Sequence, residues 1–170
     1  MTIFEPMVKI LFVCLGNICR SPMAEAIFNQ QIKKLGLSEH FQADSAGTSS
    51  YHIGNEPDPR ALLVLRKHLT PLKHKARQFK KGDFNKFDYI MVMDRMNYQD
   101  IKDLKPDRIK KDVLYLRQFD ELNFGNKEVP DPYYGNEDDF LAVYKIIEMS
   151  VIGFIKYLKN AHPQLKEGKK

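Results

Sequence analysis

The chain has 170 residues and a formal net charge of +5 at pH 7, which gives enough length for one domain with a buried core and favours anionic partners. It holds only two cysteines, which excludes a disulfide-braced scaffold. No apolar run approaches the roughly 20 residues of a membrane span, and the first residues lack a secretion-signal pattern, so we expect a cytoplasmic protein with no membrane partner.

In chain order, a continuous apolar run at 8–13 predicts a buried strand, and apolar residues at helical spacing predict a helix over 22–35. A strand at 41–46, a turn-rich loop and a helix over 60–68 follow. A strand at 89–93, a helix over 96–104 and a strand at 113–116 come next, before one long amphipathic helix that carries the apolar residues from Phe140 to Leu158. This alternation predicts an α/β fold, a single domain over 1–170 with an open parallel sheet between helices. We expect flanking tails at 1–7 and 163–170, the second disordered from Leu165 onward.

The positive residues are scattered along the chain, for example at Lys80-Lys81 and between Lys105 and Lys111. No aromatic residues are interleaved with them, as they are in many nucleic-acid sites. This distribution is typical of a solvated surface, so we expect no nucleic-acid partner.

The strongest chemical signal is the segment that joins the first strand to the first helix, Val13-Cys14-Leu15-Gly16-Asn17-Ile18-Cys19-Arg20-Ser21-Pro22. The backbone N–H groups of such a loop can curl into a nest that binds a tetrahedral oxyanion, and the N-terminus of the following helix adds partial positive charge. Gly16 and Asn17 tolerate the unusual backbone angles that a nest requires. Arg20 offers a planar fork for two phosphate oxygens. The loop therefore predicts a phosphate site formed by Leu15, Gly16, Asn17, Ile18, Cys19, Arg20 and Ser21.

Cys14 stands at the end of the strand, beneath the predicted helix dipole and near Arg20, and both favour a thiolate. A thiolate at the floor of an anion site suits phosphate ester cleavage in two steps, through a cysteinyl phosphate that water then hydrolyses. Pro22 fits the first turn of the helix and Ser21 its N-cap position. Arg20 and the loop amides meet the phosphate charge, and the five histidines show no ligand-like pairing, so we expect neither a metal nor another cofactor.

This segment resembles the phosphate-binding loop of the low-molecular-weight protein tyrosine phosphatases. Further segments match that family in order, at Asp44-Ser45-Ala46-Gly47-Thr48, Asp58-Pro59-Arg60-Ala61, His74-Lys75-Ala76-Arg77-Gln78 and Asp131-Pro132-Tyr133-Tyr134-Gly135. The resemblance runs from about residue 8 to residue 158. It implies a Rossmann-like, four-stranded parallel sheet with helices on both faces, and the hydrolysis of phosphotyrosine in proteins or of small aryl phosphates.

The resemblance also implies roles for single residues. From its own surroundings, between Pro130 and Pro132, Asp131 is as typical of a turn as of a catalytic loop. The resemblance makes it the general acid that protonates the leaving phenolate and the base that then activates water. It further implies that Asn17, Ser45 and His74 support the loop, and that Ser21 donates to the sulfur of Cys14. Cys19 can trap an oxidised Cys14 as a disulfide, a hypothesis that two thiols in one loop suggest.

Aromatic residues are expected to receive the phenyl ring of the substrate by stacking. Tyr133 and Tyr134 form one predicted wall and Tyr51 the opposite one, where the family often has tryptophan. Ile18 presents an apolar side chain to the ring, whereas related bacterial phosphatases that act on phosphoarginine tend to carry threonine there. These residues favour phosphotyrosine as the substrate.

Three alternatives stay open. The first is a phosphoarginine phosphatase on the same fold. The second is a thiol-coupled arsenate reductase, which relays through further cysteines that this chain lacks outside the loop. The third is an inactive phospho-binding module, against which the intact set of Cys14, Arg20 and Asp131 speaks.

Overall fold

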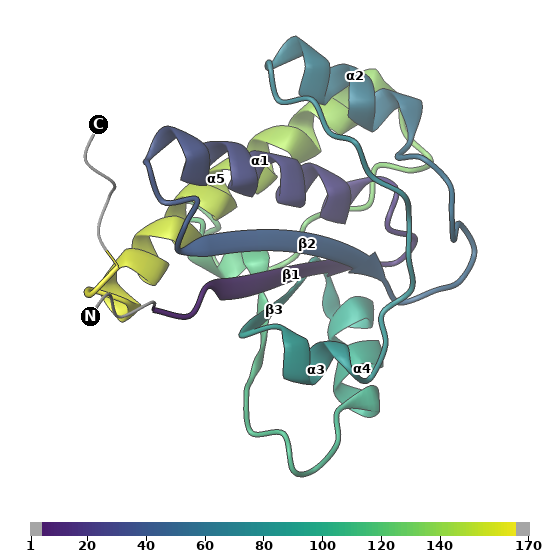
Figure 1. The fold of residues 1–170 in the computed structure, drawn as a ribbon. Coiled ribbons are helices and arrows are strands. Elements are labelled where there is room, and N and C mark those ends of the chain that lie inside the picture. The colour runs from purple at the N-terminus through teal and green to yellow at the C-terminus, as the bar shows by residue number, and fades with distance from the viewer. Residues whose placement is uncertain (1–4, 166–170) are drawn as a thin grey trace.

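Four parallel strands form one sheet in the order β2-β1-β3-β4, as the computed structural model of the chain shows for residues 5–165 (Figure 1). The strands are β1 (Val8–Cys14), β2 (Phe41–Gly47), β3 (Tyr89–Val92) and β4 (Val113–Tyr115). β1 lies at the centre, and its last residue is in register with the last residue of β2, Cys14 with Gly47. A central parallel strand is buried on both faces, which explains the continuous apolar run at 8–13.

Helices cover both faces of this sheet (Figure 1). On one face lie α1 (Arg20–Lys34) and α5 (Glu137–Ala161), with α2 (Pro59–Lys67) packed against both. On the other face lie α3 (Asp83–Lys86) and α4 (Arg95–Leu104). Alternate residues of β1 enter the two cores: Ile10 and Phe12 pack with α1 and α5, and Leu11 and Val13 pack on the other side. The predicted α/β architecture with helices on both faces is therefore observed.

Several predicted boundaries needed correction. The fourth strand ends at Tyr115, because Leu116 begins a short 3₁₀ helix, η1 (Leu116–Phe119). α3 was not predicted, since four residues carry no helical period. α1 begins at Arg20 with Cys19 at its N-cap, so the N-cap prediction for Ser21 is wrong. The hydroxyl of Ser21 lies inside the first turn and faces the sulfur of Cys14 instead.

The predicted C-terminal tail also begins too early. Leu165 is buried and packs against the larger core, so the chain is still in contact with the domain after α5 ends. The remainder of that tail, 166–170, and residues 1–4 of the predicted N-terminal tail lie outside the described residues. Among the helices of residues 5–165, none combines the length and the apolar character needed to cross a membrane.

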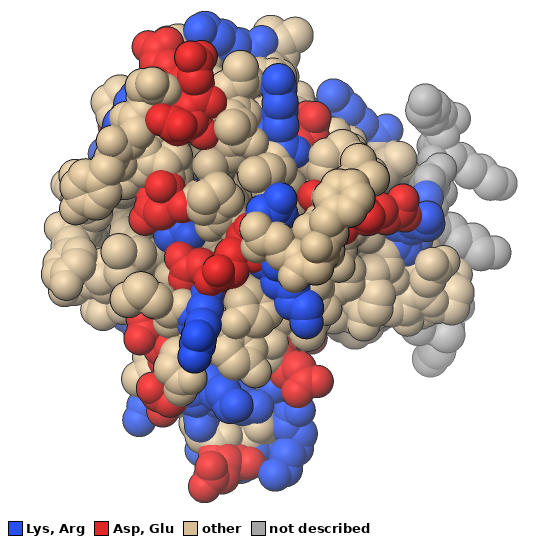
Figure 2. All heavy atoms as spheres, turned by 180° about the vertical axis from the view of Figure 1, so that it is seen from behind, with Lys and Arg blue, Asp and Glu red and all other residues tan. Residues whose placement is uncertain are grey.

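The charged side chains are mixed on the face that Figure 2 shows. Lysine and arginine lie beside aspartate and glutamate over most of this face, without one continuous positive area. Opposite charges at such short range offset one another, so the net charge of +5 is not gathered into a single patch on this side.

Candidate active site

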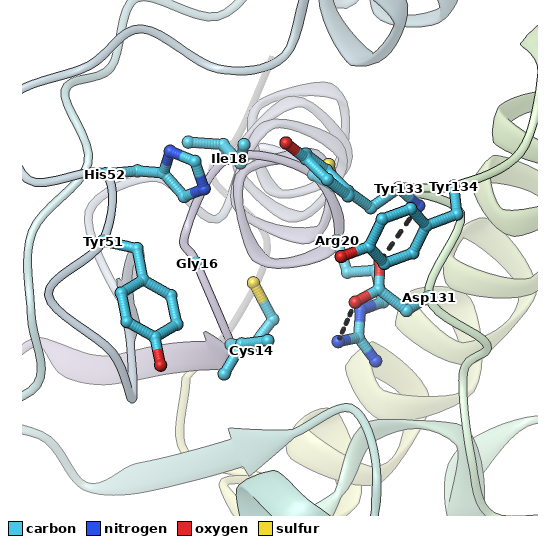
Figure 3. A pocket seen from close by; sticks show the side chains of 11 residues that line it. Cys14, Gly16, Ile18, Arg20, Tyr51, His52, Asp131, Tyr133 and Tyr134 are labelled. Atoms are coloured by element: carbon cyan, nitrogen blue, oxygen red, sulfur yellow. Dashed lines mark hydrogen bonds and ion pairs between the residues drawn. The ribbon is translucent and has the colours of Figure 1, made fainter.

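A cavity of about 330 Å³ opens beyond the carboxyl end of β1 (Figure 3). The sulfur of Cys14 points into it, between Tyr51 and His52 on one side and Asp131 and Tyr134 on the other. The carboxyl ends of parallel strands are where open α/β sheets bind ligands. The predicted site residues that line this cavity are Cys14, Leu15, Gly16, Ile18, Cys19, Arg20, Tyr51, Asp131, Tyr133 and Tyr134.

The loop that follows β1 is held tightly from outside. The backbone N–H groups of Thr48, Ser49 and Asp58 donate to the carbonyls of Cys14, Leu15 and Ile18 at 2.8–2.9 Å. Gly47, at the end of β2, lies so close that a Cβ there would stand 2.7 Å from a loop carbonyl oxygen. A side chain at this position would therefore displace the loop backbone, which explains the glycine.

Asn17 fixes the loop from beneath. It is fully buried and adopts the left-handed conformation with φ of 56°. Its amide nitrogen donates to the hydroxyls of Ser21 and Ser45, both at 2.9 Å. Its amide oxygen accepts from His74 Nε2 at 2.8 Å and from the backbone N–H of Arg77 at 3.0 Å. All four hydrogen-bonding positions of the amide are thus used, so this network holds the loop in one conformation.

Both thiols of the loop are free and buried. Cys14 Sγ lies 3.0 Å from the hydroxyl of Ser21. Burial, and to a lesser degree the charges of Asp58 and Cys14, raises the pKa of the Cys19 thiol far above its ordinary value. Cys19 is therefore a neutral thiol at physiological pH, and the sulfur of Cys14 points into the cavity.

Arg20 is buried and makes three contacts through its terminal nitrogens. NH1 donates to Asp94 Oδ2 at 2.7 Å and to the carbonyl of Val129 at 3.0 Å, and NH2 donates to Asp131 Oδ2 at 3.3 Å. Burial by itself would lower the pKa of Arg20, but Cys14 and the two carboxylates outweigh it and raise that pKa. The guanidinium is thus a permanent positive charge whose orientation is fixed by Asp94.

Aromatic and apolar side chains surround the mouth of the cavity (Figure 3). Tyr51 is 77% exposed and Tyr134 is 98% exposed, so neither is committed to packing in the core. Tyr133 stands edge-on to Tyr134 with ring centroids 5.0 Å apart. Ile18 lines the cavity from the loop. An aromatic ring that entered this space would meet π faces and an aliphatic side chain.

Comparison with known proteins decides the family. The sequence model of the family described as low molecular weight phosphotyrosine protein phosphatase matches residues 9–164. The chain belongs to this family. A low molecular weight phosphotyrosine protein phosphatase of Schizosaccharomyces pombe is 46% identical over 138 residues, which make up 81% of this chain and 88% of the relative.

Solved structures agree with this assignment. A protein tyrosine phosphatase from Entamoeba histolytica superposes with a TM-score of 0.86 at 40% identity, over 91% of this chain and 98% of that one. DARP, described as a drosophila arginine phosphatase, superposes with a TM-score of 0.84 at 32% identity, over 89% of this chain and 98% of its own. The predicted family and the predicted fold class are confirmed.

Some residues of this phosphatase site had not been predicted. His52 lines the cavity and packs over Gly16. A Cβ on Gly16 would lie 2.9 Å from the imidazole ring of His52. Asp94, which lies just after β3, holds Arg20 at 2.7 Å. The carbonyl of Val129 has no side-chain signature at all. Position at a strand end was the only sequence signal available for Asp94, and none existed for the other two.

A buried acid lies beneath the network around Asn17. Glu25 Oε1 accepts from the hydroxyl of Ser45 at 2.9 Å and lies 3.5 Å from His74 Nδ1. Burial, reinforced by the neighbouring Asp44, raises the pKa of Glu25 to about 8, and burial lowers the pKa of His74. We therefore expect both groups to be neutral at pH 7 in the phosphatase.

The elevated pKa of Glu25 predicts a pH-dependent stability. Glu25 keeps its proton in the folded chain and loses it in the unfolded chain, so the free energy of unfolding falls as pH rises toward about 8. The fall is at most about 1.4 kcal/mol per pH unit for one group. His74, with its lowered pKa, acts in the opposite sense only below about pH 6.5, the ordinary histidine value.

Urea unfolding of wild type and Glu25→Gln between pH 6.5 and 8.5 measures this effect. Glutamine keeps an acceptor for Ser45 and removes the titration, so we expect a shallower loss of stability with pH in the variant. Equal slopes in both proteins would show that Glu25 does not carry the proton.

Proposed function

We propose that this phosphatase hydrolyses phosphotyrosine esters through a cysteinyl phosphate on Cys14. The observation that carries this proposal is the convergence of Cys14, Arg20 and Asp131 on one cavity, although Arg20 and Asp131 are 111 positions apart in the chain. A nucleophile, a fixed cation and a carboxyl group at one point are the parts that phosphoryl transfer to sulfur and protonation of a phenolate require.

In the first step, the thiolate of Cys14 attacks phosphorus from the side opposite the phenolic oxygen. The S–P bond forms as the P–O bond breaks, and Asp131 transfers its proton to the departing oxygen. Arg20 and the loop N–H groups meet the charge on the equatorial oxygens. The outward hydrogen bonds of the loop carbonyls support this part, because they leave the loop N–H groups to serve a ligand.

In the second step, water attacks phosphorus and the S–P bond breaks. Asp131, now ionised, takes the proton of that water, and the electron pair of the bond returns to Cys14 as a thiolate. The hydroxyl of Ser21, 3.0 Å from the sulfur, stabilises this thiolate by donating to it. Every charge in the scheme is met by Arg20, the loop or Asp131, so we propose a reaction with no metal or other cofactor.

The lining of the cavity favours phosphotyrosine over phosphoarginine. The rings of Tyr51, Tyr133 and Tyr134 can stack on a phenyl group, and Ile18 offers that group aliphatic contact. A positively charged guanidino group can also lie on the rings, but against Ile18 it would lose hydration without gaining a hydrogen bond. Arsenate reduction needs further thiols, and both cysteines of the chain lie in one loop. We place the protein in the cytoplasm, where its reactive thiol stays reduced.

A substrate panel tests this proposal. We expect wild type to hydrolyse a phosphotyrosine peptide at least ~10-fold faster, in kcat/KM, than the same peptide with phosphoarginine, because a few apolar contacts contribute that much discrimination. Ile18→Thr should lower the ratio of kcat/KM for the phosphotyrosine peptide to kcat/KM for the phosphoarginine peptide, because it removes an aliphatic contact to the phenyl ring. Preference for the phosphoarginine peptide, or activity only on arsenate with a dithiol, would contradict the substrate assignment.

A further inference from the structure

Arg60 lies outside the cavity but connects the two loops that form it. Its segment is tied to the phosphate loop, because the N–H of Asp58 donates to the carbonyl of Ile18 at 2.8 Å. Asp58 is also the N-cap of α2, where its Oδ1 accepts from the N–H of Arg60 at 2.8 Å. The start of α2 is therefore fixed relative to the loop that carries Cys14.

The guanidinium of Arg60 is held in place from two sides. Asp58 binds it with both carboxylate oxygens, Oδ1 with Nε at 3.0 Å and Oδ2 with NH2 at 2.9 Å. It also stacks on the ring of Phe140 in α5, with 4.4 Å from its central carbon to the ring centroid. Because Asp58 binds the guanidinium at two points and Phe140 covers one of its faces, the group has little freedom to rotate.

The guanidinium of Arg60 also donates to the acid loop, residues 131–135, which carries Asp131. NH1 donates to the carbonyl of Gly135 at 2.8 Å, and NH2 donates to the carbonyl of Tyr133 at 2.9 Å. The N–H of Tyr133 in turn donates to Asp131 Oδ1 at 3.1 Å. Arg60 thus fixes the residue whose N–H orients the carboxyl group of Asp131.

The far end of this loop is fixed as well. Asn136 caps α5, and the side chain of Asp139 accepts from the N–H of Asn136 at 2.8 Å. The same carboxylate packs so closely on Gly135 that no Cβ would fit there. Between Pro130 and α5, Arg60 therefore supplies a second connection to the phosphate loop, in addition to the contact between Arg20 and Asp131.

We propose that Arg60 is a positioning residue that sets the placement of Asp131 relative to Cys14. The proposal rests on the proposed function, since it assigns Arg60 to the protonation of the leaving group. A general acid must stand within hydrogen-bonding reach of the departing oxygen, and a displacement of about 1 Å can cost ~10²-fold in rate. Without Arg60, the loop from Tyr133 to Gly135 loses two hydrogen bonds, and the placement of Asp131 then depends on its 3.3 Å contact with Arg20.

The test is the dependence of kcat/KM on the leaving group, measured with a series of aryl phosphates, because kcat/KM reports the first step, in which the phenol departs. Arg60→Gln should lose about 10- to 100-fold in kcat/KM with phenyl phosphate and far less with the phosphate of an electron-poor phenol, which departs without a proton. The matched control is Arg66→Gln, an exposed arginine on the same helix, which should keep the wild-type dependence. An Arg60→Gln enzyme with the same leaving-group dependence as wild type would overturn the proposal.

A double-mutant cycle separates positioning from general destabilisation. If Arg60 acts through Asp131, Arg60→Gln should change kcat little in an Asp131→Asn background. An equal loss in both backgrounds would overturn the proposal. Arg60→Lys, which keeps the charge but not the fork, serves if Arg60→Gln does not fold, and should show the same leaving-group effect in weaker form. A wild type that hydrolyses no aryl phosphate would refute the proposed function itself, a different outcome from any of these.

Discussion

Replacing Cys14 with serine is expected to lower kcat on phenyl phosphate by ~10⁴-fold or more, because a serine hydroxyl in this loop has no general base to activate it. Ser21, whose hydroxyl lies 3.0 Å from the sulfur, is not a base, and Arg20 stays protonated. Phosphate binding should persist, since Arg20 and the loop backbone are unchanged. Steady-state kinetics, with calorimetric titration of inorganic phosphate, measure both quantities.

Cys19→Ser provides the comparison within the same loop. Cys19 is a buried, neutral thiol at the N-cap of α1, and serine is a favourable N-cap residue. We therefore expect a much smaller loss than for Cys14→Ser. Similar losses in the two variants would mean that the loop tolerates neither change and that Cys14 has no special role. Substantial turnover by the Cys14→Ser protein would exclude Cys14 as the nucleophile.

Asp131→Asn is expected to lower kcat on phenyl phosphate by ~10²–10⁴-fold, the usual contribution of a general acid. Asparagine keeps the size of the side chain and an oxygen that accepts the N–H of Tyr133, so the loop should stay in place. The loss in kcat/KM, which reports the first step, should shrink with an electron-poor aryl phosphate. A uniform loss in kcat/KM across leaving groups would assign Asp131 a structural role only.

The second step gives Asp131→Asn a further expected property. With an electron-poor substrate the first step needs no acid, whereas the hydrolysis of the intermediate still needs a base. The variant should therefore release one equivalent of phenol per enzyme in a rapid burst and then turn over slowly. Stopped-flow absorbance detects the burst, and its absence at high substrate would argue against a rate-limiting second step.

The phosphate loop could be predicted from the sequence because its parts are contiguous. Cys14 and Arg20 are six positions apart, and the strand and the helix on either side have clear periods. Asp131 was different: its own surroundings were those of a turn, and only the family resemblance assigned it to the site. In the structure, Oδ2 of Asp131 lies 3.3 Å from NH2 of Arg20.

What sequence reasoning missed depends on tertiary contacts. Arg60 and Asp94 act on the site through hydrogen bonds to residues 73 or more positions away, which no local pattern encodes. The error at Ser21 has a similar origin. A serine before a helix is usually a cap, but here the hydroxyl contacts Cys14 and Asn17, and the helix begins at Arg20, two residues before the predicted start.

The central claim is a covalent bond between phosphorus and the sulfur of Cys14, and trapping that species tests it most directly. Asp131→Asn is mixed with an electron-poor aryl phosphate, quenched during steady state, digested and analysed by mass spectrometry. The account predicts one phosphate on the peptide that contains Cys14, bound through sulfur, and none in the Cys14→Ser protein. Phosphate on any other residue, or phenol release without a phosphorylated enzyme at any time, would contradict it.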